Sequence, residues 1–183
     1  MVSGKPHSRL YRGLMGKPEN LRTTLACGLA GDVVCKFGEV RLRVFGTSMV
    51  PSILPGDLIS VQRAELSEIS SGEIVLYSRD GRLFAHRVVA RAGSHDDPRL
   101  ITRGDRLFHS DPPVSSLEML GRVTSIQCGD GRGHRPVRPA ARVRRWEQMI
   151  ARVLQISDRA TSVYLRLVGY WRSLFSGRAA CRA

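Results

Sequence analysis

The chain has 183 residues with a hydrophobic content of 42%, which suits one domain with a packed core and excludes wholesale disorder. Its formal net charge of +13 predicts attraction to something acidic: nucleic acid, an anionic membrane surface or an acidic partner protein. No apolar run approaches the roughly 18 residues that span a bilayer, and no secretory leader pattern is visible, so we expect a cytoplasmic or peripherally membrane-associated protein.

The N-terminal part, residues 1–37, is expected to be a polar tail followed by a helix from Pro18 to about Lys36. Proline is favoured in the first turn of a helix, and Glu19 follows it there. Apolar residues then recur four positions apart, at Leu21, Leu25, Leu29 and Val33.

The middle of the chain, residues 38–128, is predicted to be a compact antiparallel β domain. Two β-rich runs flank the pair Asp80-Gly81, whose residue types suit the positive φ angles of a two-residue hairpin turn. The predicted strands are "EVRLRVFG", "DLISV", the two arms of "EIVLYSRDGRLFAHRVVAR", "RLITRGD" and "LGRVTSIQ". The fold class is therefore mainly β, with flanking N- and C-terminal α-helices.

The C-terminal part, residues 129–183, is predicted to be a basic linker rich in Arg, Pro and Gly, followed by a basic amphipathic helix from about Ala140 to Phe175. Such a helix suits docking onto the rest of the protein, insertion into an anionic membrane surface, or contact with a partner protein or nucleic acid. The apolar stripe comprises Trp146, Met149, Ile150, Val153, Leu154, Val163, Tyr164, Leu167, Val168, Trp171 and Phe175.

The cysteines and histidines show no metal-binding pattern. Cys27, Cys35, Cys128 and Cys181 form neither a CxxC pair nor a Cys/His cluster with zinc spacing. We therefore expect reduced, scattered thiols and neither a metal nor another cofactor.

Ser48 lies in "GTSMVPSILPGD" (46–57), a stretch that suits either a solvated loop or a loop holding a nucleophile. A serine hydroxyl becomes nucleophilic when a neighbouring base accepts its proton. The lysines are confined to positions 5, 17 and 36, whereas His86 lies inside a predicted strand of the β domain. His86 is thus the candidate base, although a histidine on a strand is more often an ordinary packed side chain.

Two aspartates are candidates for orienting that imidazole. Asp105 follows a strand in "TRGD", and Asp111 lies in "HSDPP". Either carboxylate suits the third position of a triad, and either also suits a structural role as a cap for backbone amides.

These segments, taken together, resemble the type I signal peptidases of the S24/S26 peptidase superfamily, which also contains the self-cleaving LexA-like repressors. "GTSMVPSILPGD" resembles the nucleophile box, and "HRVV" resembles the base box of the endoplasmic-reticulum and archaeal type, which uses histidine where the bacterial enzymes use lysine. "ITRGD" resembles the Gly-Asp box, and "LGRVTSI" the closing strand. The order and spacing agree over roughly residues 40 to 127.

The resemblance implies a mostly β catalytic fold with a shallow groove for an extended peptide or protein substrate, cleaved after small residues. It implies Ser48 as nucleophile and His86 as general base. In the histidine type a second aspartate lies six residues after the first, as Asp111 does after Asp105. Asp111 is therefore implied as the orienting acid, with Asp105 close by.

The resemblance also implies the surroundings of the nucleophile. Met49 and Pro51 would shape the floor of the groove, and the backbone N–H of Ser48 would donate to the oxyanion. The family carries a hydroxyl residue two positions before the nucleophile, where this chain has Gly46, so Thr47 is the candidate substitute. The basic C-terminal helix has no counterpart in the usual enzymes.

Two other functions compete with a signal peptidase-type serine endopeptidase. One is a basic binding module on the same fold, but no nucleic-acid-binding motif supports nucleic acid as the partner. The other is a regulator that cleaves only itself, for which "TLACGLAGD" (24–32) and "RPAARV" (138–143) offer cuts after small residues.

Overall fold

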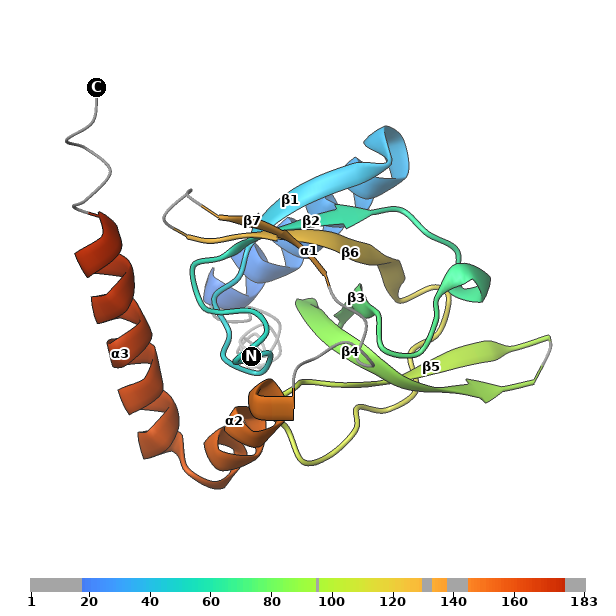
Figure 1. Ribbon diagram of the computed structural model, residues 1–183. Helices are drawn as coiled ribbons and strands as arrows, with labels where there is room; N and C mark the ends of the chain where they lie inside the picture. Colours follow the sequence, from blue (N-terminus) through green and yellow to red (C-terminus); the bar gives the residue numbers. More distant parts are fainter. Residues whose placement is uncertain (1–17, 95, 130–132, 138–144, 177–183) are drawn as a thin grey trace, which may run out of the picture.

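The computed structural model describes residues 18–94, 96–129, 133–137 and 145–176 (Figure 1). A helix precedes a run of strands, and two helices end the described part of the chain. In chain order the elements are α1 (Pro18–Phe37), β1 (Glu39–Arg43), β2 (Leu58–Gln62), the short 3-10 helix η1 (Leu66–Glu68), β3 (Ile74–Arg79), β4 (Arg82–Gly93), β5 (Pro98–Arg103), β6 (Met119–Gln127), β7 (His134–Pro136), α2 (Arg145–Ile156) and α3 (Asp158–Ser176).

One seven-stranded antiparallel sheet forms the centre of the molecule, in the order β1-β2-β6-β3-β4-β5, with β7 also paired to β6. Long β6 pairs with β2 along one edge; its other edge pairs first with β3 and then with β7. The predicted fold class, mainly β with flanking helices, is confirmed.

The β3–β4 hairpin forms where the sequence predicts it. Asp80 and Gly81 both have positive φ, at 51° and 68°, as a two-residue hairpin turn requires. The turn sets the register from Arg79 opposite Arg82 to Ile74 opposite Arg87. This register places His86 of β4 opposite Val75 of β3.

Two clusters of buried side chains fill the β domain, one for each part of the sheet. Strands β2, β3 and β6 and the loop between β1 and β2 supply the first, and the η1, β3, β4 and β5 region supplies the second. The first comprises Met49, Ile53, Ile59, Val61, Ile74, Leu76, Val123 and Ile126; the second comprises Leu66, Ile69, Val75, Tyr77, Val88, Leu100 and Val114.

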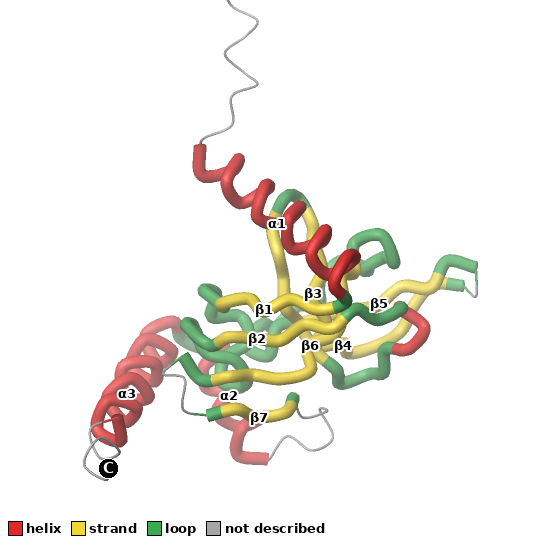
Figure 2. The backbone as a smooth tube through the Cα atoms, turned by 90° about the horizontal axis from the view of Figure 1, so that it is seen from above, coloured by secondary structure: helices red, strands yellow, loops and turns green. Residues whose placement is uncertain are grey.

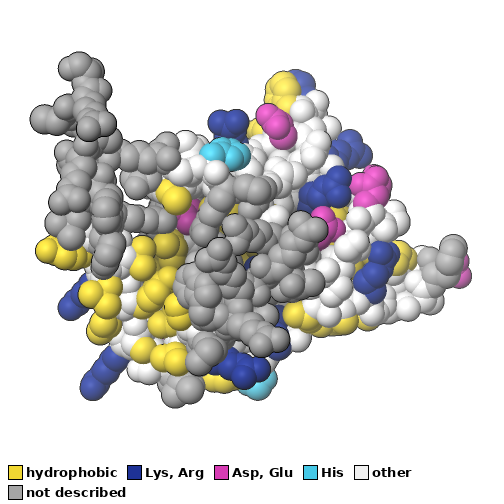
Figure 3. All heavy atoms as spheres, in the orientation of Figure 1, with side chains coloured by type: hydrophobic (Ala, Val, Ile, Leu, Met, Phe, Trp, Pro, Cys, Tyr) yellow, Lys and Arg dark blue, Asp and Glu magenta, His cyan; other side chains and the backbone are white. Residues whose placement is uncertain are grey.

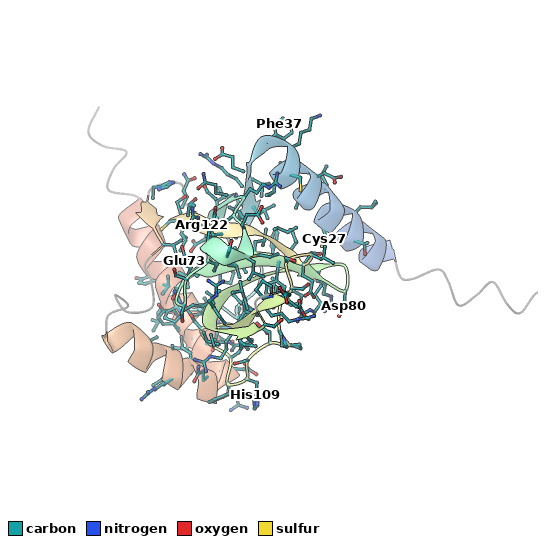
Figure 4. The ribbon with its side chains drawn as sticks, turned by 90° about the vertical axis from the view of Figure 1, so that its right-hand side faces the viewer. Cys27, Phe37, Glu73, Asp80, His109 and Arg122 are labelled. Carbon is teal, nitrogen blue, oxygen red and sulfur yellow. The ribbon has the colours of Figure 1, made fainter. Side chains whose placement is uncertain are left out.

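Helix α1 packs against the rest of the protein through Val34, which is 1% exposed, and through two small residues. Cys27 and Ala30 are buried, whereas Leu25 and Leu29 are 64% and 65% exposed. The Cys27 thiol donates a hydrogen bond of 3.0 Å to the carbonyl oxygen of Gly81 in the hairpin turn, close to Asp80 in Figure 4. Small side chains on this face let the helix approach the turn closely, which bulky leucines would prevent.

The C-terminal region differs from its prediction in two places. The expected single helix is two helices, because Ser157 interrupts it and its Oγ accepts a hydrogen bond from the Ala160 N–H at 3.4 Å, as a cap for α3. The break turns Leu154 into the core at 3% exposure and leaves Val153 58% exposed. Strand β7 lies in the expected linker, whose residues 130–132 and 138–144 are outside the described part.

The α2–α3 helix pair and α1 lie on different sides of the sheet (Figure 2). The described helices include none with both the length and the apolar character needed to cross a bilayer.

Candidate active site

Ser48 lies in the loop 46–57 between β1 and β2, which we call the Ser48 loop. Two apolar residues of this loop, Val50 and Ile53, are fully buried and anchor the loop in the core. Asp57, also fully buried, accepts hydrogen bonds from the N–H groups of Leu54 at 3.0 Å and Gly129 at 3.2 Å. The loop is therefore held by core packing and by a buried carboxylate, which fixes the half-buried Ser48 side chain in place.

His86 reaches the Ser48 loop from the middle of β4. It is 3% exposed, and its Nε2 lies 3.0 Å from Ser48 Oγ. The rings of Tyr77 and Phe84 border it at centroid distances of 6.1 and 5.9 Å. An imidazole enclosed in this way has little freedom to rotate away from the hydroxyl.

Asp111 holds the other side of the imidazole. Its Oδ2 lies 2.7 Å from His86 Nδ1 and accepts a second hydrogen bond of 2.7 Å from the Thr102 hydroxyl. Partial burial raises the pKa of Asp111, but the hydrogen bonds from His86 and Thr102 outweigh it and hold this pKa below its ordinary value. Because an ionised carboxylate only accepts, Nδ1 carries the hydrogen and the Nε2 lone pair faces Ser48.

Asp105, which the resemblance placed close to the orienting acid, pairs with Arg87. Both oxygens of the carboxylate accept hydrogen bonds of 2.8 Å, from Arg87 Nε and Nη2. Arg87 is 8% exposed and also donates to the carbonyl oxygen of Gly72 at 2.8 Å. This bidentate pair ties the start of the loop that leads to Asp111 to strand β4.

The other residues predicted around the nucleophile lie at different depths. Thr47 and Pro51 are half-buried beside Ser48, and Gly46 is exposed. Met49 is 2% exposed and belongs to the main core, so it supports the loop from beneath.

Tyr77, Arg87 and Thr102 belong to the site although the sequence analysis did not select them. Tyr77 places its hydroxyl 3.5 Å from His86 Nδ1, and burial raises its pKa to about 12, so the phenol stays neutral. Arg87 directly follows His86, and period-two alternation sends it to the opposite face of the strand. Because Arg87 is adjacent to His86, it could have been found from the sequence. Thr102 comes close to Asp111 only because the chain folds back after β5, where the Asp111 N–H donates to the Thr102 carbonyl oxygen at 2.8 Å.

Taken together, a hydroxyl, an imidazole and a carboxylate are linked in series, which is the arrangement that activates a serine oxygen. Their catalytic roles remain predictions. Among the described residues, no group of His, Cys, Asp and Glu side chains could hold a metal ion.

Comparison with known proteins shows the family of this chain. A family model described as "Peptidase S24-like" matches residues 28–124. The signal peptidase complex catalytic subunit sec11 of Neurospora crassa is 37% identical over 71 residues, which are 37% of this chain and 41% of that protein. The chain thus matches less than half of that relative's length. The predicted resemblance to the S24/S26 superfamily is confirmed.

Proposed function

Because the chain belongs to the Peptidase S24-like family, we propose that it is a serine endopeptidase of the signal peptidase type. The observation that carries the proposal is the series of contacts from Ser48 Oγ to His86 Nε2 at 3.0 Å and from His86 Nδ1 to Asp111 at 2.7 Å. The substrate is an extended peptide segment, cut after small residues.

In the proposed reaction, the Ser48 hydroxyl passes its proton to His86 Nε2 while Oγ attacks the carbonyl carbon of the scissile bond. Ionised Asp111 stabilises the imidazolium that forms. The tetrahedral oxyanion accepts a hydrogen bond from the backbone N–H of Ser48, and the Thr47 hydroxyl is the candidate second donor. His86 then protonates the leaving amine, and a water molecule, deprotonated by His86, hydrolyses the acyl-enzyme.

The test is a census of protein N-termini by mass spectrometry in cells that carry the wild-type chain, Ser48→Ala or His86→Ala. New N-termini that follow small residues should appear with the wild type and vanish with either variant, since each loses an essential member of the relay. Ser116→Ala and His109→Ala change exposed residues of the same types and serve as controls (His109 is labelled in Figure 4). Identical censuses for all five proteins, each folded and abundant, contradict the proposal.

Self-cleavage receives less support than cleavage of another protein. The candidate cut in residues 24–32 lies within helix α1, whereas a peptidase of this kind takes an extended strand. The other candidate, residues 138–143, lies outside the described residues.

We also propose an anionic membrane surface as a partner of α3, whose outer face carries Val163, Leu167 and Tyr170, each more than half exposed. Arg159 and Arg166 are exposed on the same helix, so apolar side chains and cations meet there as interfacial helices require. Figure 3 shows hydrophobic side chains gathered over the α2–α3 region with basic ones beside them.

Co-sedimentation with lipid vesicles tests this partner. The protein should sediment with vesicles that contain phosphatidylglycerol and much less with pure phosphatidylcholine, and Leu167→Glu should reduce binding at least tenfold. Leu117→Glu makes the same change at a 94% exposed position in the β domain and should leave binding unchanged. Equal loss in both variants, or no binding by the wild type, speaks against a membrane partner.

A further inference from the structure

The α2–α3 helix pair lies outside the residues that match the family model, yet it packs directly against the Ser48 loop. Val50 and Leu54 of that loop are 0% and 7% exposed, and both join an apolar cluster with Leu154 of α2. Partly buried residues of both helices pack against this cluster: Ile150 of α2, and Ala160, Tyr164, Leu165 and Val168 of α3. The loop that carries the candidate nucleophile therefore rests on the helix pair as well as on the β domain.

Both helices also hold the segment 105–107 through polar contacts. Gln155 Nε2 of α2 donates to the carbonyl oxygens of Asp105 and Leu107, at 3.1 and 3.4 Å. Arg106 Nη1 donates to Asp158 Oδ1 at 2.9 Å and to Thr161 Oγ1 at 3.0 Å in α3. The backbone and the side chain of one short segment are thus held by two different helices.

That segment in turn contacts the main chain of Ser48. The Arg106 N–H donates a hydrogen bond of 2.8 Å to the Ser48 carbonyl oxygen. Gly104 lies so close that a Cβ there would approach the same oxygen to 2.8 Å. Because the two backbones are in close contact here, a shift of the 105–107 segment also moves Ser48. Such a shift changes the 3.0 Å distance between Ser48 Oγ and His86 Nε2.

We propose that the C-terminal helix pair is a positioning element of the active site, acting on Ser48 through Gln155 and Arg106 and the 105–107 segment. This inference rests on the proposed peptidase function, whose reacting groups it aligns. Gln155 and Arg106 act as positioning residues, because their side chains contact neither Ser48 nor His86. A carboxylate at position 155 would face two carbonyl oxygens and push the segment away.

Peptide hydrolysis by Gln155→Glu is the first test. Misplacement of the nucleophile should lower kcat by about tenfold to a hundredfold while KM changes less than twofold, because only the alignment of the reacting groups is disturbed. Gln62→Glu makes the same chemical change at an exposed position of β2 and should match the wild type. Arg106→Gln, which keeps the backbone N–H to Ser48 but loses both contacts to α3, should reproduce the effect in a second fold-competent variant.

A readout independent of turnover separates this inference from the proposed function. The 15N resonance of His86 Nε2 reports its hydrogen bond to Ser48, and Ser48→Ala gives the position without that bond. In Gln155→Glu and Arg106→Gln the resonance should move towards the Ser48→Ala position, even if no peptide substrate is cleaved. Wild-type resonances together with a wild-type kcat in both folded variants overturn the positioning role.

Discussion

His86 and Arg87 are neighbours on β4, yet they serve different carboxylates. His86 contacts Asp111 at 2.7 Å, whereas Arg87 binds Asp105 through two hydrogen bonds of 2.8 Å. Successive side chains of a strand point to opposite faces, so one dipeptide supplies both the candidate base and the guanidinium that anchors the neighbouring loop. This separation keeps the permanently charged arginine away from the imidazole, so Asp111 pairs with His86 and not with Arg87.

Thr102 tunes the carboxylate that orients His86. Its hydroxyl is one of three side-chain donors, with His86 and Tyr77, that lower the pKa of Asp111. Thr102→Val should therefore raise that pKa, with a 13C NMR titration of the carboxyl as the measurement. Thr102→Ser keeps the donor and should leave the titration of Asp111 in place. A titration in Thr102→Val that coincides with the wild type refutes this role.

Asp57 is expected to carry much of the stability of the Ser48 loop. Asp57→Asn replaces one acceptor oxygen by an NH2 group that faces a backbone N–H, at a fully buried position. We expect the free energy of unfolding to fall by about 1–3 kcal/mol in urea titrations. Asp80→Asn is the control, since this exposed residue has a φ of 51° that asparagine also tolerates. Equal stabilities of the two variants would disprove the assignment.

At the scale of elements, close contacts between backbones decide how the pieces fit. Gly121 of β6 lies against the carbonyl group of Gln62 in β2, so that a Cβ there would collide with it. Helix α1 sits on the hairpin turn in a similar way, with Thr24 against Gly81 and Cys27 bonded to it. These contacts require glycine or small residues, whereas Leu25 and Leu29 of α1 are exposed.

Two glycine-to-alanine changes should therefore have opposite signs. Gly121→Ala forces β2 and β6 apart and should destabilise the protein by about 2 kcal/mol or more. Gly28→Ala lies on an open face of α1, with nothing within 4 Å of the new Cβ, and should stabilise the helix by about 0.5–1 kcal/mol. Thermal unfolding of both variants tests this prediction. Stabilisation by both substitutions would show that a Cβ at position 121 does not destabilise the protein.

At the scale of the whole molecule, the stability of a chain with a net charge of +13 depends on carboxylates that pair with its many arginines. Glu118 binds Arg79 at 2.6 Å, and Arg79 also donates to the carbonyl oxygens of Pro112 and Pro113, directly after Asp111. This network closes the loop that delivers Asp111 to the site. Acid should weaken it while the positive charge of the whole protein rises.

The hydrogen bond from Arg79 lowers the pKa of Glu118 from its ordinary 4.5 to about 2. A carboxylate with a depressed pKa in the folded state stabilises the protein above its unfolded pKa, and this stabilisation is lost as the pH falls from about 4.5 towards 2. Glu118→Gln should remove about 2 kcal/mol of stability at pH 7 and flatten the acid limb in urea unfolding. Glu65→Gln, at an exposed position, is the control. If stability falls with acid in Glu118→Gln as steeply as in the wild type, Glu118 does not contribute to the acid sensitivity.

Local pattern was enough to predict most of the fold and part of the candidate site. Alternating strands, the Asp80-Gly81 turn and the helix beginning at Pro18 depend on neighbours in sequence, so they could be predicted. The resemblance of two segments to the family's boxes likewise singled out Ser48 and His86. The Ser157 break escaped prediction because the apolar stripe continued on both sides of it, which hid a local capping signal.

The sequence by itself determined which residue types are available: a serine in an anchored loop, a histidine on a strand and two aspartates. The residue types alone left both aspartates open, and the family resemblance implied Asp111; the tertiary structure supplies the contacts, from Asp111 to His86 and from Asp105 to Arg87. It also brought Gln155 of α2 onto the carbonyl oxygen of Asp105. The physical reason is that such contacts join residues far apart in the chain, and strand register and helix packing, which set them, come from the fold as a whole.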